Sequence, residues 1–343
     1  MSAPPILHQV VFIAGALFCL TSLLDPAIAT PPIALALGIV LALLFRNPFR
    51  ALARLVSKYL LQACVVMLGF SMDLPIILRA GARGAVMAAL TIAATIALGF
   101  FLGRRLRIDS KTSALISSGT AICGGSAIAA VAAVIGAAEG QVAVAIGAVF
   151  ILNAVALYIF PPIGHALELS QEQFGIWAGV AIHDVSSVVG AAARYGDEAL
   201  QIATAVKLSR TLWIIPLSFA AAYAFRKASS SSTRTGGAEG QVRAKPGPGA
   251  GVRRTAPTIP YFIVLFLLAS LARTLSPAIA DAAPTLARLA KAGLTLTLFL
   301  IGAGISLATL KTVGIRALVQ AVLLWLFISL VSLAAVMSVE NPA

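Results

Sequence analysis

Glycines and hydroxyl side chains interrupt a long apolar segment at residues 117–126, which read Ser-Ser-Gly-Thr-Ala-Ile-Cys-Gly-Gly-Ser. Unwound backbone at membrane depth is tolerated only where it packs in protein or lines a wet cavity. The free N–H groups of a following half-helix would then present a positive dipole end to an anion. The pattern predicts a binding loop for a small anionic solute, with the ligands Ser118, Thr120, Cys123, Gly124, Gly125 and Ser126. The alternative is that small residues here only allow close helix packing.

Two cations lie three residues apart in a later apolar segment, Lys207 and Arg210. This spacing places both on one face of a helix, where they would attract an oxyanion, since arginine offers a planar fork of donors. Two other interpretations stay open. The cations could extend to the outer headgroups, or they could form a salt bridge with Asp184.

His183 and Asp184 are adjacent in the middle of another apolar segment, where ionisable residues are functional by default. On a helix their side chains would point about 100° apart. Because histidine titrates near physiological pH, the pair is predicted to couple transport to protons. Alternatively, Asp184 pairs with a buried lysine or arginine and fixes helix packing. One histidine and one aspartate supply too few ligands for a metal site, and we expect no cofactor.

The composition places most of the chain in lipid. Of its 343 residues 60% are hydrophobic and 11% are charged, whereas soluble domains carry about 25% charged residues. The net charge of +13 is concentrated in short polar loops, which indicates membrane orientation and excludes nucleic acid as the expected partner. The sequence contains no nucleophile elbow, Walker loop, HExxH or CxxC motif, so no enzyme is predicted.

The elements that position these residues are apolar runs long enough to cross a bilayer. They predict an all-α polytopic membrane protein of about eleven transmembrane helices, at 8–24, 31–46, 56–73, 84–103, 111–137, 141–163, 174–195, 200–225, 259–276, 286–309 and 314–338. A stretch rich in Ser, Gly, Pro and Arg at 229–257 predicts a disordered basic linker. It separates an N-terminal membrane half at 1–228 from a C-terminal part at 258–343.

Basic residues gather in three loops, at 46–58, 104–111 and 226–254. These loops follow the second, fourth and eighth predicted spans, so all three lie on one side of the membrane. The positive-inside rule makes that side cytoplasmic. The N-terminus is therefore predicted in the cytoplasm and the C-terminus on the opposite side.

Two internal matches suggest repeats. Residues 68–90 align with 301–323, at an offset of seven spans, which would invert one copy relative to the other as in many transporters. Residues 119–126 align with 179–186, at an offset of two spans, so these copies would run the same way. The two matches do not fit one simple repeat, and the first is preferred because the second is compatible with chance in an Ala/Gly-rich chain.

The segments GTAICGGSAIAA (119–130), GVAIHDVSSVVGAA (179–192), KLSRTLWIIPL (207–217) and LTLFLIGAGISL (296–307) resemble the YeiH family of bacterial inner-membrane proteins. Members are described as sulfate exporters, and the family is similar to cation/proton antiporters and bile-acid symporters. The resemblance implies inverted repeats, a panel domain, a core domain and two broken helices that cross near the midplane. For the second broken helix the preferred candidate is the tenth span at 302–304, and the rival is the seventh at 183–184.

The first functional hypothesis is export of a small oxyanion, such as sulfate, by alternating access. The second is a cation/proton antiporter of the same architecture with Asp184 as the ion-binding carboxylate. Asp184→Asn would abolish the second activity and could spare the first. The third is a membrane scaffold or enzyme without transport. The expected partners are a small anion and the lipid bilayer, and the sequence also admits a homodimer.

Overall fold

The computed structural model describes residues 5–25, 28–45, 47–72, 74–232, 261–304 and 313–338, and every regular element within them is helical. Within these described ranges, seven helices are long and apolar enough to cross a membrane, and the shorter α2, α6 and α12 are also apolar. The prediction of an all-α polytopic membrane protein is confirmed. Beyond Ser232, the predicted linker lies outside the described residues.

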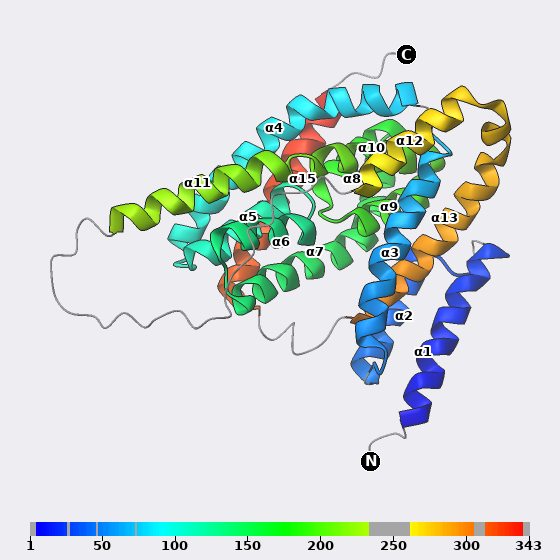
Figure 1. Cartoon of the computed structure of the whole chain (residues 1–343), viewed down its shortest axis with the longest axis horizontal. Helices are drawn as coiled ribbons and strands as arrows, with labels where there is room; N and C mark the ends of the chain where they lie inside the picture. Colours follow the sequence, from blue (N-terminus) through cyan, green and yellow to red (C-terminus); the bar gives the residue numbers. More distant parts are fainter. Residues whose placement is uncertain are drawn as a thin grey trace.

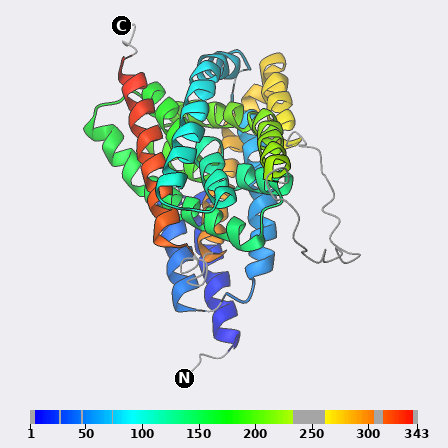
Figure 2. The ribbon, with the colours of Figure 1, turned by 90° about the vertical axis from the view of Figure 1, so that its left-hand side faces the viewer.

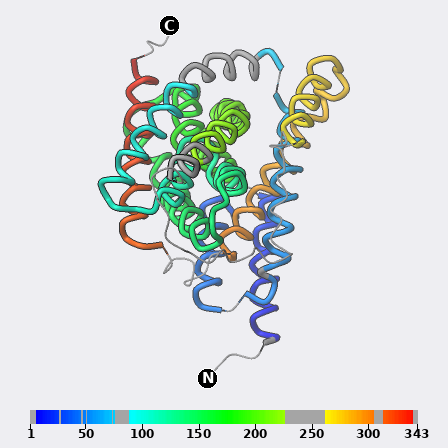
Figure 3. Tube along the Cα trace, turned by 60° about the vertical axis from the view of Figure 1, so that its left-hand side comes forward, coloured from blue at the N-terminus to red at the C-terminus, as the bar shows by residue number. Residues whose placement is uncertain are grey.

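The helices form two bundles (Figures 1 and 3). The panel bundle contains α1 (Pro5–Leu20), α2 (Pro31–Leu44), α3 (Arg50–Gly69), α12 (Tyr261–Leu275) and α13 (Pro277–Gly304). The core bundle contains α4 (Leu74–Arg105), α5 (Ser110–Ala121), α6 (Gly125–Ile135), α7 (Glu139–Ala166), α8 (Gln171–Ala181), α9 (Val185–Tyr195), α10 (Asp197–Thr211), α11 (Ile214–Ser232) and α15 (Ile315–Ser338). Each bundle therefore takes helices from both sides of the predicted linker. The start of α1 and the end of α15 lie at opposite ends of the molecule (Figure 2).

Glycines allow α2 and α13 to pack backbone against backbone in the panel bundle. A Cβ on Gly38 would lie 2.2 Å from the carbonyl oxygen of Phe299, and one on Gly302 would lie 2.5 Å from that of Leu35. Small residues bring membrane helices together in this way. The helix α13 continues to Gly304, and Gly302 serves a helix contact within it. The rest of predicted span ten, from residue 305 on, lies outside the described residues, so a break in this span stays a prediction.

Hairpin 1 consists of α5 and α6, which run antiparallel. At its base the Lys111 ammonium donates to the carbonyl oxygen of Gly136 at 2.8 Å. Further along, a Cβ on Gly119 would lie 2.8 Å from the side chain of Ile128. The chain reverses at residues 122–124, where Gly124 has a φ of +67°. The segment predicted as the fifth crossing therefore enters the core bundle and returns.

Hairpin 2 consists of α8 and α9, and it reverses at residues 182–184. The rings of Phe174 and Tyr195, near its two ends, stack with centroids 3.8 Å apart. The Tyr195 hydroxyl also donates to the carbonyl oxygen of Leu169. Helices of this length span about 17 Å, roughly half of a 30 Å hydrocarbon core. Span seven is thus the second interrupted element, and it too is a hairpin instead of a crossing.

The hairpins change the interpretation of the internal matches. Residues 119–126 and 179–186 occupy equivalent positions in the two hairpins, which end at Gly136 and Gly196. A hairpin with its following helix makes one crossing, so the second copy is inverted relative to the first. The match considered compatible with chance therefore marks a structural repeat. Of the other match, residues 305–312 and the side chains of 76–87 lie outside the described part of the chain.

The predicted orientation is unaffected by this change. A hairpin returns the chain to the side from which it entered, so two hairpins leave every basic loop on its predicted side. With the predicted orientation, hairpin 1 would enter from the cytoplasmic side and hairpin 2 from the opposite side.

Candidate functional site

The tips of the two hairpins meet inside the core bundle. A Cβ on Gly124 would lie 3.6 Å from Cβ of His183 and 3.7 Å from Cβ of Asp184. Two segments sixty residues apart in sequence, both singled out by their composition, therefore form one locus. Here unwound backbone is buried in protein, as membrane depth requires.

The start of α6 is the uncapped helix terminus at this locus. Gly124 is its N-cap and provides no side-chain hydrogen bond, while Gly125 is half-buried and Ser126 is exposed. The first N–H groups of a helix have no partner within the helix, and together with the helix dipole they favour an anion. Within the predicted anion cradle, Gly125 and Ser126 have this geometry, whereas the Gly124 N–H donates to the carbonyl oxygen of Gly119 at 2.8 Å.

Gly124 is required by its backbone conformation. Its φ of +67° and ψ of −124° are accessible mainly to glycine, and a Cβ would also lie 3.2 Å from Val149. We expect Gly124→Ala to destabilise the protein by about 1–3 kcal/mol, measured as a lower thermal unfolding midpoint in detergent. Gly125→Ala is the matched control, because its Cβ would meet only Phe150, at 3.9 Å. Equal midpoints for the two variants would contradict this account of the tip.

The start of α9 is instead capped by Asp184. The carboxylate accepts hydrogen bonds from the Ser187 N–H at 2.6 Å and from the hydroxyls of Ser186 at 2.6 Å and Ser187 at 3.0 Å. His183 and Asp184 lie in the turn between two helices, so the expected 100° separation on one helix does not apply. Asp184 supplies the negative charge that this helix terminus favours.

Lys207 and Arg210 are completely buried on α10 and point at the tip of hairpin 1. The Lys207 ammonium donates to the carbonyl oxygen of Ile122 at 3.2 Å. Arg210 donates to the carbonyl oxygen of Ala121 and, at 2.9 Å, to the hydroxyl of Thr91. Neither cation extends to the headgroups. Both neutralise the end of α5, whose dipole is equivalent to about −0.5 charge, so positive charge remains in excess.

Several buried polar atoms around the tips have no hydrogen-bond partner among the described residues. They are the Thr120 hydroxyl, Nδ2 of Asn153, both ring nitrogens of His183 and Nε of Arg210. An unsatisfied buried group costs about 1–3 kcal/mol, so such a cluster is unfavourable unless a polar ligand engages it.

The structure brings together most of the residues predicted for the site. Cys123 packs at the tip of hairpin 1 beside Ile122 and Ala127. Ser118 is the exception, because its hydroxyl donates to the carbonyl oxygen of Ala114 within α5. The site also contains Asn153 and Thr91, which were not among the predicted site residues. Their signal was a polar side chain within an apolar run, which does not by itself reveal the partner.

The helix that follows each hairpin supports the tip of the other. Asn153 on α7, which follows hairpin 1, accepts the His183 N–H of hairpin 2 at 3.0 Å. Lys207 and Arg210 on α10, which follows hairpin 2, bind the carbonyls of hairpin 1. The two halves of the inverted repeat therefore hold one another's unwound backbone.

These features define a class, a multi-pass α-helical membrane protein with two opposed helical hairpins that meet at a polar locus. The chain belongs to the family described as conserved hypothetical protein 698, whose model matches residues 6–321. This is the YeiH family that the motifs indicated, so that prediction is confirmed.

Relatives carry the name UPF0324 membrane protein. The one from Bacteroides thetaiotaomicron is 46% identical over 89% of this chain and 86% of its own length. The one from Bdellovibrio bacteriovorus is 42% identical over 96% of this chain and 94% of its own length. The one from Geobacter sulfurreducens is 45% identical, covering 88% and 89%. No solved structure matches the chain.

Proposed function

We propose that the protein is a secondary transporter that exports a small oxyanion, with sulfate as the first substrate to test. The observation that carries the proposal is the pair of hairpin tips that meet beside two fully buried cations and one partly buried carboxylate. Interrupted helices whose N-termini face a solute at the midplane are a recurrent transporter design. The excess positive charge selects an anion, and the N–H groups of α6 replace part of its hydration shell.

The membrane potential favours the outward direction. Moving one charge through 100 mV is worth about 2.3 kcal/mol, so a dianion gains about 4.6 kcal/mol on leaving a negative-inside cell. Import would need coupled cations to offset this field. Export in the bacterial inner membrane is therefore the mechanism with the fewest requirements.

A cation/proton antiporter of the same architecture is less well supported. Asp184 would have to bind the cation, but its oxygens already accept three hydrogen bonds from Ser186 and Ser187. A carboxylate has about four acceptor sites, so little capacity is left. The two buried cations beside the tips would also repel a transported cation.

The test is counterflow of ³⁵S-sulfate into proteoliposomes preloaded with unlabelled sulfate. We expect transient accumulation of label with the wild-type protein and none with Gly125→Leu, whose side chain would cover the N–H groups at the start of α6. Empty liposomes and liposomes with Gly125→Leu serve as matched controls. Label uptake equal to that of empty liposomes for sulfate, and for other small oxyanions tested in turn, would overturn the proposal.

A further inference from the structure

Asn153 occupies the junction between the two hairpin tips. It is 2% exposed, and Val149, one turn earlier on α7, lies 3.2 Å from a Cβ position on Gly124 and 3.3 Å from one on Gly119. The Oδ1 atom of Asn153 accepts the His183 N–H at 3.0 Å. α7 therefore follows hairpin 1 and holds the tip of hairpin 2 through this side chain, while Leu157 and Phe160 of α7 pack against hairpin 2 further from its tip.

The bond to His183 fixes the direction of the Asn153 amide. A flipped amide would place its NH2 group against the His183 N–H, donor against donor, so Oδ1 faces the backbone. Its Nδ2 atom then points elsewhere and is buried without a partner among the described residues. The hydroxyl of Thr120, at the end of α5, is in the same condition and is 1% exposed.

We propose that Asn153 is a specificity-determining substrate ligand, which donates from Nδ2 to an oxygen of the transported oxyanion while Oδ1 holds the tip of hairpin 2. The inference rests on the proposed function. It adds a neutral side-chain ligand to the two buried cations and the N–H groups at the start of α6. A neutral donor recognises an unprotonated oxygen without adding charge. Because one side chain binds both the substrate and the His183 N–H, substrate binding is linked to the position of hairpin 2.

Asn153→Asp separates the two roles of the side chain. Aspartate has the same shape and keeps an oxygen that accepts the His183 N–H, but it replaces the donor with a carboxylate oxygen. We expect the half-saturating sulfate concentration in counterflow to rise at least about tenfold, since juxtaposed like charges cost several kcal/mol. The rise should be smaller for the monovalent oxyanion nitrate, and the maximal rate should change less than the half-saturating concentration.

Two further variants keep the test decisive. Thr120→Val is nearly isosteric and removes the other buried hydrogen-bond donor without a described partner. It should also raise the half-saturating concentration, and it serves as the test if Asn153→Asp fails to fold. Ser113→Ala is the matched control, because its buried hydroxyl bonds with Gly99 and Gln320 away from the tips, and it should leave the half-saturating concentration unchanged.

The possible outcomes are distinguishable. Wild-type transport with unchanged half-saturation in folded Asn153→Asp overturns the inference alone, and unchanged half-saturation in Thr120→Val does so if Asn153→Asp does not fold. Loss of maximal rate with unchanged half-saturation assigns Asn153 to support of the hairpin and also overturns it. A wild-type protein that moves no oxyanion overturns the proposed function together with the inference.

Discussion

Replacement of Lys207 by methionine should abolish most oxyanion counterflow while leaving the protein folded. Methionine keeps the apolar stem of the side chain and removes only the charge. At separations of 4–8 Å and an effective dielectric constant near 20, a unit charge is worth about 2–4 kcal/mol to an anion, which corresponds to a loss of affinity of roughly 30- to 1000-fold. The measurement is the initial rate of ³⁵S-sulfate counterflow over a range of concentrations.

The comparison variants identify which role of Lys207 is lost. Lys207 also donates to the carbonyl oxygen of Ile122, so its removal could act by loosening hairpin 1. Lys207→Arg keeps the charge and should retain more activity than Lys207→Met. Lys291→Met removes a partly exposed lysine from the panel bundle, and the loss of such a surface pair costs only about 0–1 kcal/mol. Normal half-saturation in Lys207→Met would contradict an electrostatic role toward substrate.

The bilayer-embedded class of this fold was predictable, but the hairpins were not predicted from hydropathy. A helical hairpin of two short apolar helices has the same average hydropathy as one crossing, so 111–137 and 174–195 were interpreted as spans five and seven. The match between 119–126 and 179–186 was the clue that distinguishes the two cases. Its offset of two spans contradicts an inverted repeat only if each hairpin is counted as a crossing. Gly302 illustrates the same ambiguity, since a glycine can either break a helix or allow another backbone to approach.

For the candidate site, the residue types in the sequence predicted which residues lie together better than they predicted which atoms those residues contact. Glycines, cations and a histidine–aspartate pair in apolar surroundings indicated residues that the structure brings together at the hairpin tips. Their partners were backbone groups, such as the Ile122 carbonyl for Lys207 and the His183 N–H for Asn153. Every residue carries these groups, so the sequence does not reveal which of them are free. For the same reason the sequence predicts that His183 and Asp184 lie on one helix, although both residues lie in a turn.

The second large effect concerns the contact between the bundles. Hairpin 2 is docked on the panel bundle, where a Cβ on Gly190 would lie 2.9 Å from Leu298 and 3.5 Å from Pro31. Its equivalent in hairpin 1, α6, packs mainly against α5, α7 and α11 of the core bundle. Ser186 and Val189 of α9 are buried, whereas Ser126 and Ala129 of α6, at the repeat-equivalent positions, are exposed.

For the proposed transporter, this asymmetry predicts how the site would change sides. In the inverted arrangement α6 would take the place of α9 against the panel bundle, and the site would then open past hairpin 2. Such a change requires the core bundle to move relative to the panel bundle. It must therefore separate contacts that join α10 to α13.

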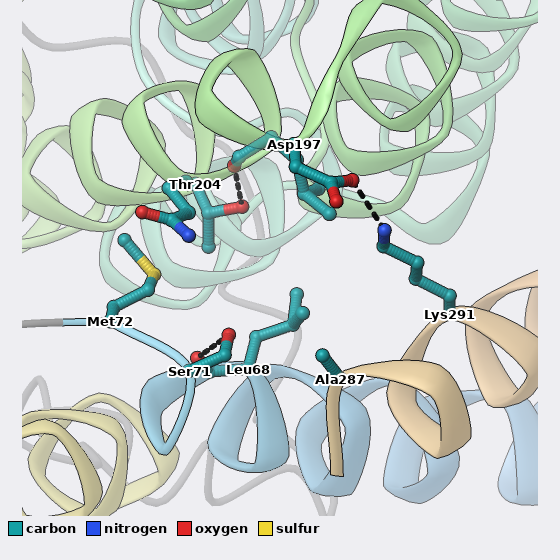
Figure 4. A pocket seen from close by; sticks show the side chains of 9 residues that line it. Leu68, Ser71, Met72, Asp197, Thr204, Ala287 and Lys291 are labelled. Carbon is teal, nitrogen blue, oxygen red and sulfur yellow. Dashed lines mark hydrogen bonds and ion pairs between the residues drawn. The ribbon is translucent and has the colours of Figure 1, made fainter. Parts of the chain in front are cut away.

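An ion pair crosses this boundary. Lys291 of α13 bonds to Asp197 at the start of α10, beside a cavity of about 50 Å³ that is also lined by Ser71, Met72 and Thr204 (Figure 4). The side chains are 37% and 77% exposed, and exposed pairs contribute about 0–1 kcal/mol. The pair is thus weak enough to break and reform in each cycle of the proposed transport.

We expect a covalent link at this position to stop transport. Asp197→Cys with Lys291→Cys, joined by a reducible bifunctional thiol reagent, should lower counterflow at least about tenfold, since the link would prevent the core bundle from moving relative to the panel bundle. A reductant should restore the rate. All three native thiols are buried. Cys19→Ala and Cys64→Ala remove two of them, and Cys123 is retained because it packs at the tip of hairpin 1. Gel mobility or mass spectrometry measures the extent of linkage.

The matched control places the same link within one bundle. Gln62 of α3 and Tyr261 of α12 are hydrogen-bonded partners in the panel bundle, so Gln62→Cys with Tyr261→Cys should cross-link without inhibition. Inhibition of both pairs would show that the reagent acts elsewhere. Full counterflow in a completely linked Asp197–Lys291 pair would mean that α10 and α13 stay together throughout transport. The site would then have to open by movement of the hairpins within a fixed core bundle, and the asymmetry between α6 and α9 would reflect a permanent difference between the two halves of the repeat.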